Sequence, residues 1–230
     1  MRTVRAADTG VSNAAICRRG ILFSENQTFS SPITGKMRAL IQAITDCGDL
    51  AILLPIAAVL TGWVLLIDKP GIIKGWFVAL ALCIGGTGIL KIYFFACPPL
   101  SDLHSPSGHT SLSTLVYGSL TLAVAASLTD WRRWLMVAAG TIFVVGIGIS
   151  RIILQAHSIP EVLLGSVLGI AALSVFVAAY VRDGATARYL APLITVSVML
   201  VIFLNGHELR AEELLHRIAT YLNLASSCRP

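Results

Sequence analysis

The run Leu50–Ile67, LAILLPIAAVLTGWVLLI, contains no charged side chain and is long enough to cross a bilayer as one helix. Five further apolar runs follow it along the chain. They are Gly75–Ala96, interrupted by Lys91, then Thr110–Thr129, Trp134–Arg151, Val162–Val181 and Tyr189–Gly206. Their hydrophobicity is continuous rather than alternating, which favours helices over the strands of a barrel. The sequence therefore predicts an all-α membrane bundle of about six transmembrane helices.

The composition supports the same class. Hydrophobic residues make up 56% of the 230 residues and charged residues 13%, with a mean hydropathy of +0.80. Soluble domains are about one quarter charged. The net charge of +5 is spread over tails and short loops, without a basic patch interleaved with aromatic residues, so nucleic-acid binding is not expected. The five cysteines are widely spaced and form no C-x-x-C pair, which argues against a disulfide framework and a zinc site.

The apolar runs divide the chain into three parts. Residues 1–45 form a mixed N-terminal tail that ends in a short amphipathic interfacial helix over Lys36–Asp46. Residues 46–206 contain the six predicted spans. Residues 207–230 form an amphipathic C-terminal tail, which we interpret as a second interfacial helix or a docking helix for a partner. No signal-peptide core precedes the first span, so that span is expected to direct insertion.

The charge of the short loops predicts the orientation in the membrane. The loops after the first, third and fifth spans must share a side, and each carries two basic residues, so they are expected to face the cytoplasm. These pairs are Lys69 and Lys74, Arg132 and Arg133, and Arg182 and Arg188. The basic N-terminal tail would then lie outside, although its positive charge by itself favours the cytoplasmic side. Charges near the ends of spans weigh most, so the short loops decide the prediction.

The segment 105–109, SPSGH, has the features of a helix start that binds an anion. Ser105 suits an N-cap and Pro106 suits the first helical position. The next three amides, up to His109, would then lack partners within the helix and would attract an anion at its positive end. Gly108 lets an anion approach the backbone closely. An ordinary helix start with a surface histidine explains the same residues equally well.

A second group of polar residues follows the fourth span. Arg151 ends an apolar run, where an unpaired charge is costly, and its guanidinium matches the geometry of a phosphate. The segment Ser158–Glu161 fits a capping box. Glu161 is also four residues after His157, a spacing at which a carboxylate orients an imidazole and holds its tautomer. The two roles of Glu161 are compatible.

Three further positions face the same side of the membrane. Lys91, near the end of the second span, either reaches the headgroups by snorkelling or binds a phosphate, and its position alone does not separate these readings. His104, which shares the next loop with Asp102, either joins the site or is a solvated loop histidine. Asp46 and Asp49 precede the first span, where they cap the helix or position headgroups.

In this order, the polar segments resemble the motifs of the type 2 phosphatidic acid phosphatase (PAP2) superfamily. Its second motif, Pro-Ser-Gly-His, is intact at residues 106–109. Its third motif is present as Ser150, Arg151 and His157, with Glu161 where the family usually has Asp.

The first motif of the superfamily is degraded. Lys91 and Pro99 fit its pattern, but Pro98 stands where an arginine is expected. The resemblance covers about residues 46–181 and excludes both tails. It implies a PAP2/haloperoxidase-like helical core.

The resemblance also implies an activity, the removal of phosphate from a lipid-linked phosphate or diphosphate. It gives His157 the role of nucleophile, forming a phosphohistidine, with Glu161 orienting it. It gives His109 the role of the acid that protonates the leaving oxygen. The implied phosphate-binding residues are Lys91, Ser107, Gly108 and Arg151.

Neither a metal nor another cofactor is expected, because fixed cations and amides can neutralise phosphoryl oxygens, and the sequence lacks a carboxylate cluster suited to magnesium. The expected partners are the lipid phosphate and the bilayer, and the oligomeric state stays open. The expected location is a bacterial inner (cell) membrane, with the active site on the extracytoplasmic side. Two alternatives remain, a lipid phosphotransferase and, because of Pro98, a weak or inactive lipid-phosphate-binding protein of the same fold.

Overall fold

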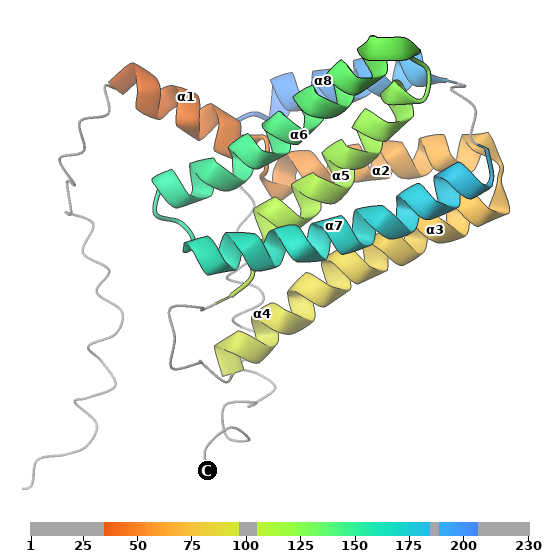
Figure 1. Cartoon of the computed structure of the whole chain (residues 1–230). Coiled ribbons are helices and arrows are strands. Elements are labelled where there is room, and N and C mark those ends of the chain that lie inside the picture. The colour runs from red at the N-terminus through yellow and green to blue at the C-terminus, as the bar shows by residue number, and fades with distance from the viewer. Residues whose placement is uncertain (1–34, 97–104, 185–188, 207–230) are drawn as a thin grey trace, which may run out of the picture. The chain divides into compact units, whose positions relative to one another are not determined.

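The computed structural model describes residues 35–96, 105–184 and 189–206. Within these ranges every regular element is helical, so the all-α prediction is confirmed (Figure 1). The elements are α1 (Gly35–Asp46), α2 (Leu50–Ile67), α3 (Pro70–Leu80), a π-helical turn η1 (Ala81–Gly85), α4 (Gly86–Ala96), α5 (Gly108–Ala125), α6 (Asp130–Ile153), α7 (Ile159–Arg182) and α8 (Leu190–Leu204). The predicted C-terminal helix lies outside the described residues.

The bundle has a helix at each of the six predicted spans, with α3, η1 and α4 following one another without a break. Four stretches of the described chain are long and apolar enough to cross a membrane. They are Gly35–Ile67, Pro70–Phe95, Asp130–Ile153 and Ile159–Arg182. α5 is as long as α2 but carries several serines and threonines, and α8 is shorter. The protein is therefore a helical membrane protein, and α5 is more polar than α2, the helix of equal length.

Several predicted bounds were wrong, mostly by a few residues. The second span begins at Pro70 rather than near Gly75, because proline fits the first turn of a helix, and Lys74 consequently lies inside α3. α6 begins at Asp130, so Arg132 and Arg133 belong to its first turn rather than to a loop. The third span ends at Ala125 and the sixth covers Leu190–Leu204.

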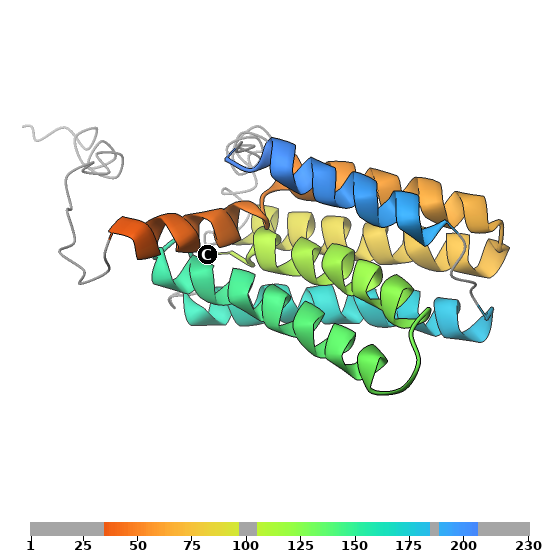
Figure 2. The ribbon, with the colours of Figure 1, turned by 90° about the horizontal axis from the view of Figure 1, so that it is seen from above.

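The basic loops lie together at one end of the bundle. The Nζ atom of Lys69, between α2 and α3, donates to the carbonyl oxygen of Asp183 at 2.6 Å and also to that of Gly184, just after α7. Figures 1 and 2 both show the α5–α6 connection at this end. The prediction that these three loops share a side therefore agrees with the fold. The starts of α5 and α7 lie at the other end.

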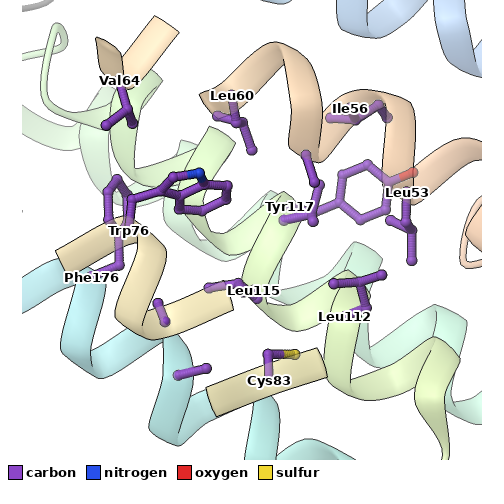
Figure 3. Packing of buried hydrophobic residues seen from close by; sticks show 14 of the residues in the cluster. Leu53, Ile56, Leu60, Val64, Trp76, Cys83, Leu112, Leu115, Tyr117 and Phe176 are labelled. Atoms are coloured by element: carbon purple, nitrogen blue, oxygen red, sulfur yellow. The ribbon is translucent and has the colours of Figure 1, made fainter. Parts of the chain in front are cut away.

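Buried side chains of α2, α3, α5 and α7 form the core between the helices (Figure 3). Trp76 is fully buried, and its indole Nε1 donates to Thr61 Oγ1 at 2.8 Å. Its ring packs edge-to-face on Phe176, with centroids 5.2 Å apart. Since the indole N–H has a partner, the large ring can be buried without an unsatisfied donor. This contact fixes α2, α3 and α7 to one another.

α5 and α7 approach each other closely because α7 has glycines at the contact. A Cβ atom at Gly165 would lie 2.5 Å from the carbonyl oxygen of Ser107, and one at Gly169 would lie 2.6 Å from that of Ser111. Such distances exclude any side chain unless the helices move apart. Two glycines four residues apart are a common device for close helix packing in membranes. They bring the first turn of α5 against the first half of α7.

The substitution Gly169→Ala should destabilise the bundle by about 1–3 kcal/mol, because the added methyl group overlaps α5 backbone and Thr114. Thermal unfolding in detergent measures this change. The matched control is Gly146→Ala in α6, where a Cβ would meet nothing within 4 Å. Equal melting temperatures for the two variants would contradict the proposed close contact.

Candidate active site

The start of α5 differs from the prediction. Ser107, not Ser105, is the N-cap, and the helix begins at Gly108 rather than at Pro106. The Oγ atom of Ser107 accepts from the amide of Thr110 at 3.4 Å and from the Thr110 hydroxyl at 3.0 Å. The threonine hydroxyl gives Ser107 a second partner, while the amide of Ser105 donates to the Glu161 side chain. The N-cap of α5 therefore lies two residues later than the position of Pro106 had predicted.

One of the three amides expected to be available is already bonded. The amide of Ser107 donates to the carbonyl oxygen of Glu161 at 3.0 Å, so the expectation of a free Ser107 amide is wrong. Gly108 and His109 occupy the first two helical positions, where amides point out of the helix end. An anion at this end would therefore meet two backbone amides and the positive end of the helix dipole.

Glu161 connects the start of α5 to the start of α7. Its side chain is buried, and Oε2 lies 2.9 Å from Nδ1 of His157 and accepts from the amide of Ser158 at 3.0 Å. Its other oxygen, Oε1, accepts from the amide of Ser105 at 3.0 Å. The capping box predicted at Ser158–Glu161 is present, so this carboxylate both caps α7 and contacts the imidazole. The carbonyl oxygen of Glu161 also accepts from the Ser107 amide, so Glu161 connects the second motif directly to the third.

A tight turn sets the relation between Arg151 and His157. Gln155 has a left-handed backbone conformation, with φ 55°, and its amide donates to the carbonyl oxygen of Ile152. The amides of Ala156 and His157 both donate to the carbonyl oxygen of Arg151, at 3.0 and 3.3 Å. This is the Schellman pattern of a helix C-terminus. It reverses the chain after α6 and holds the backbone of His157 against that of Arg151.

Lys91 lies over the start of α5. Its side chain is only 4% exposed, and a Cβ atom at Gly108 would lie 3.6 Å from Lys91 Cε. One turn earlier on the same face of α4, Thr87 Oγ1 lies 3.0 Å from Ser111 Oγ. A lysine that snorkels to water would be more exposed. Gly108 therefore leaves the space through which the lysine approaches the helix end.

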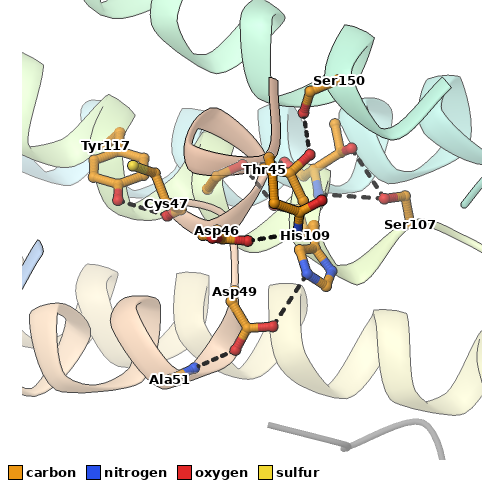
Figure 4. A network of polar contacts seen from close by, with 12 residues as sticks. Thr45, Asp46, Cys47, Asp49, Ala51, Ser107, His109, Tyr117 and Ser150 are labelled. Atoms are coloured by element: carbon orange, nitrogen blue, oxygen red, sulfur yellow. Dashed lines mark hydrogen bonds and ion pairs between the residues drawn. The ribbon is translucent and has the colours of Figure 1, made fainter. Parts of the chain in front are cut away.

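His109 lies opposite an acidic residue that caps α2. The Nε2 atom of His109 is 3.4 Å from Oδ2 of Asp49, whose other oxygen accepts from the amide of Ala51 at 2.8 Å (Figure 4). Asp49 is 5% exposed and His109 is partly buried. Of the two roles that the sequence left open for Asp49, capping is present. One carboxylate oxygen holds the helix start, which leaves the other to face the imidazole.

α1 packs across the same end of the bundle. Thr45 Oγ1 contacts Ser150 Oγ, and Ser150 also donates to the carbonyl oxygen of Ile147 at 2.7 Å (Figure 4). The hydroxyl of Tyr117 donates to the carbonyl oxygen of Cys47 at 2.7 Å, which ties α5 to the α1–α2 connection. These contacts fix the position of Asp49, which follows two residues after Cys47.

The structure brings the predicted site residues to one end of the bundle. His157 and Glu161 lie at the start of α7, Arg151 at the end of α6, Lys91 on α4, and Ser107, Gly108 and His109 at the start of α5. Pro98, Pro99, Asp102 and His104 fall outside the described residues. Among those that are described, no group of three or more His, Cys, Asp or Glu residues is arranged to hold a metal ion.

Sequence reasoning missed two features that build this site. The pairing of Asp49 with His109 joins residues 60 positions apart, and no sequence pattern signals it. The glycines at 165 and 169 do form a recognisable small-x-x-x-small pattern within an apolar run. That pattern would have indicated a close helix contact, although not which helix is contacted.

The bundle and its polar end define a helical membrane protein with two histidines, each beside a carboxylate, and with the lysine Lys91 over a helix start. The chain belongs to the PAP2 superfamily, whose family model matches residues 73–185. It is also 28% identical, over 78% of its own length and 90% of the relative, to an uncharacterized 22.5 kDa protein in the cps region of Klebsiella pneumoniae. No solved structure gives a significant match. Membership of the superfamily supports a phosphatase-type function in general.

The substitution Glu161→Ala should destabilise the protein by about 1–3 kcal/mol, because it leaves buried amides without their acceptor. Thermal unfolding in detergent is the measurement. Ser158→Ala is the control, since it removes the serine half of the same capping box and should cost about 1 kcal/mol. Equal losses in the two variants would show that Glu161 acts only as a helix cap.

Proposed function

We propose that this protein is a membrane phosphatase that hydrolyses a lipid-linked phosphate or diphosphate through a phosphohistidine intermediate. The observation that carries the proposal is the double connection of Glu161 to His157 and to the segment before Gly108. Through it, a nucleophile and a phosphate-binding helix start belong to one rigid unit. The superfamily match supports the general class of reaction.

His157 acts as the nucleophile. Its Nδ1 atom faces the Glu161 carboxylate, so the tautomer with a proton on Nδ1 is favoured and Nε2 carries the lone pair. Nε2 attacks phosphorus, forming an N–P bond while the P–O bond to the lipid breaks. The Glu161 carboxylate stabilises the positive charge that develops on the ring, as the orienting residue of a nucleophile–base pair does.

His109 acts as the general acid. With one ring nitrogen facing Asp49, the other can donate a proton to the leaving lipid oxygen. In the second step, neutral His109 takes a proton from a water molecule, whose oxygen attacks phosphorus and breaks the N–P bond. Inorganic phosphate leaves, and both imidazoles return to their starting protonation states.

The remaining residues hold the phosphoryl oxygens. Lys91 and Arg151 supply positive charge, and Ser107 and the Gly108 amide supply donors at the start of α5. Fixed cations and amides neutralise the oxygens in the transition state without a metal ion. Metal independence is accordingly part of this proposal.

The active site faces the extracytoplasmic side of a bacterial cell membrane in this proposal. The support is the position of the basic residues Lys69, Arg132, Arg133 and Arg182 at the opposite end of the bundle. A phosphate tethered to a lipid can then enter from the outer leaflet without leaving the bilayer.

The direct test assays phosphate release from several lipid phosphates and diphosphates by purified protein, with and without a chelator. The wild type should release phosphate in both conditions. His157→Ala should lose at least about 1,000-fold in activity, because the nucleophile is gone. Full activity in this variant would refute the covalent mechanism, and loss with chelator would refute metal independence. A product that depends on an added alcohol would instead indicate a phosphotransferase.

The substitution Asp49→Asn tests the general acid. Asparagine still caps α2, but it no longer faces His109 with a negative charge. The kcat/KM for an alkyl phosphate should fall about tenfold, a part of the 10²–10⁴ that a general acid contributes. The kcat/KM for 4-nitrophenyl phosphate should change little, because this quantity reports the step in which the leaving group departs, and that leaving group needs no proton.

The control for this test is Asp46→Asn, because Asp46 is also buried but its Oδ1 accepts from Gln42 at 2.9 Å. It should leave both substrates unaffected. An equal loss on both substrates in Asp49→Asn would contradict a role in proton donation.

A further inference from the structure

A groove lies between α3 and α7 at the end of the bundle that carries the basic loops. The two helices run in opposite directions, so the start of α3 at Pro70 lies beside the end of α7 at Arg182 (Figure 1). Both helices belong to stretches that are long and apolar enough to cross a membrane, so these ends lie near the membrane surface. The groove has a volume of about 450 Å³, and the candidate active site is at the opposite end of the bundle.

Small residues form the floor of this groove, and aliphatic residues form its deeper end. A Cβ atom at Gly75 would overlap that of Ala179, so the two helices touch closely here, and Ala178 continues the floor on α7. From Gly71 near the membrane surface to Val78, the α3 side extends over seven residues, or about 10 Å. This depth takes the groove from the membrane surface into the hydrocarbon.

The outer end of the groove carries two cations. Lys74 is exposed, and within the described part of the chain it has no hydrogen-bond or ion-pair partner. The Arg182 side chain is 73% exposed, and its Nε atom lies 3.1 Å from Oδ1 of Asp183. The two terminal amino groups of that guanidinium have no partner among the described residues, so they are available to an anion.

The neighbouring carboxylate does not neutralise both cations. The second oxygen of Asp183 lies over Gly71 in the first turn of α3, where a Cβ atom would overlap it. A carboxylate at this place is stabilised by the positive end of the helix dipole. Lys69 adds further positive charge nearby, since its Nζ atom donates to backbone carbonyl oxygens rather than to a carboxylate. The outer end of the groove therefore attracts anions.

We infer that this groove binds an anionic phospholipid of the leaflet next to the basic loops. Its phosphate lies between Lys74 and Arg182, and one acyl chain lies over the small residues toward Val78 and Val175. The order of charged and apolar groups along the groove matches the order of headgroup and chain in a lipid. Basic pockets between transmembrane helices are a known way to hold such headgroups.

This lipid is distinct from the proposed substrate. Its phosphate lies at the end of the bundle opposite His157, so it is held and not hydrolysed. A phosphate that contacts Lys74 and Arg182 together joins the start of α3 to the end of α7. Since it binds the folded bundle, it should also raise the temperature of unfolding.

The test measures lipid binding to the purified full-length protein in a neutral detergent by native mass spectrometry. Dioleoyl phosphatidylglycerol is compared with dioleoyl phosphatidylcholine, which has the same chains and no net charge. Glycerol 3-phosphate supplies a phosphate headgroup without chains. Phosphatidylglycerol should bind about 30-fold more tightly than phosphatidylcholine, as expected for two basic residues near the membrane surface, and should raise the melting temperature. Glycerol 3-phosphate should do neither.

Two kinds of variant locate the bound lipid. Lys74→Gln and Arg182→Gln should each weaken phosphatidylglycerol binding about fivefold. Their controls are Arg132→Gln and Arg133→Gln, which remove exposed cations of α6 at the same end but outside the groove. They should bind as the wild type does.

Ala178→Trp fills the floor while keeping both cations, and it should reduce phosphatidylglycerol binding to the level of phosphatidylcholine. Its control is Val181→Trp, at a position of α7 that is 66% exposed and outside the groove. It should leave binding unchanged.

Equal affinity of the wild type for the two lipids would overturn the inference. Wild-type affinity in Lys74→Gln and Arg182→Gln, or equal losses in the α6 controls, would overturn it too, because the charge of the groove would then be irrelevant. Wild-type affinity in a folded Ala178→Trp protein would show that the lipid is attracted only to surface charge. If that variant does not fold, the two charge variants decide, since they change exposed side chains only. Tight binding of glycerol 3-phosphate would assign the site to a soluble anion instead.

Discussion

The close contact between α5 and α7 is the interaction on which the rest of the site depends. Helices in a bilayer gain little from the hydrophobic effect on association, so they rely on close packing and on hydrogen bonds. Gly165 and Gly169 permit an approach at which the backbone of Ser107 and Ser111 touches α7. With the start of α5 fixed there, its first two amides and His109 are held beside the start of α7.

Glu161 makes contacts at the starts of both α5 and α7 that the shorter side chain of aspartate would reach less easily. Its two oxygens reach His157, Ser158 and the amide of Ser105, and its carbonyl oxygen accepts from Ser107. The superfamily pattern has aspartate at this position, and the additional methylene gives the carboxylate a longer reach. Glutamate in place of aspartate therefore fits a structural role, because the Glu161 side chain caps α7, contacts the His157 imidazole and bonds the segment before α5.

The polar residues of α5 explain how such a helix can lie inside an apolar bundle. The hydroxyls of Ser113 and Thr114 donate to carbonyl oxygens of their own helix, and Ser111 contacts Thr87 on α4. Satisfied hydroxyls carry little cost in an apolar interior. The same property leaves mostly apolar groups on the face of α5 toward α6 and α7, while its first turn forms the polar site.

The sequence by itself determined the helical membrane class, the approximate position of each span and the residues of the motifs, because these depend on local composition and spacing. The capping box at Ser158 is equally local. Only the tertiary structure decided that Ser107 rather than Ser105 caps α5, since the amides of both serines bond to Glu161 on α7 and hold this segment outside the helix. The pairing of Asp49 with His109 likewise depends on how separate helices pack, which the spacing of residues within one helix does not encode.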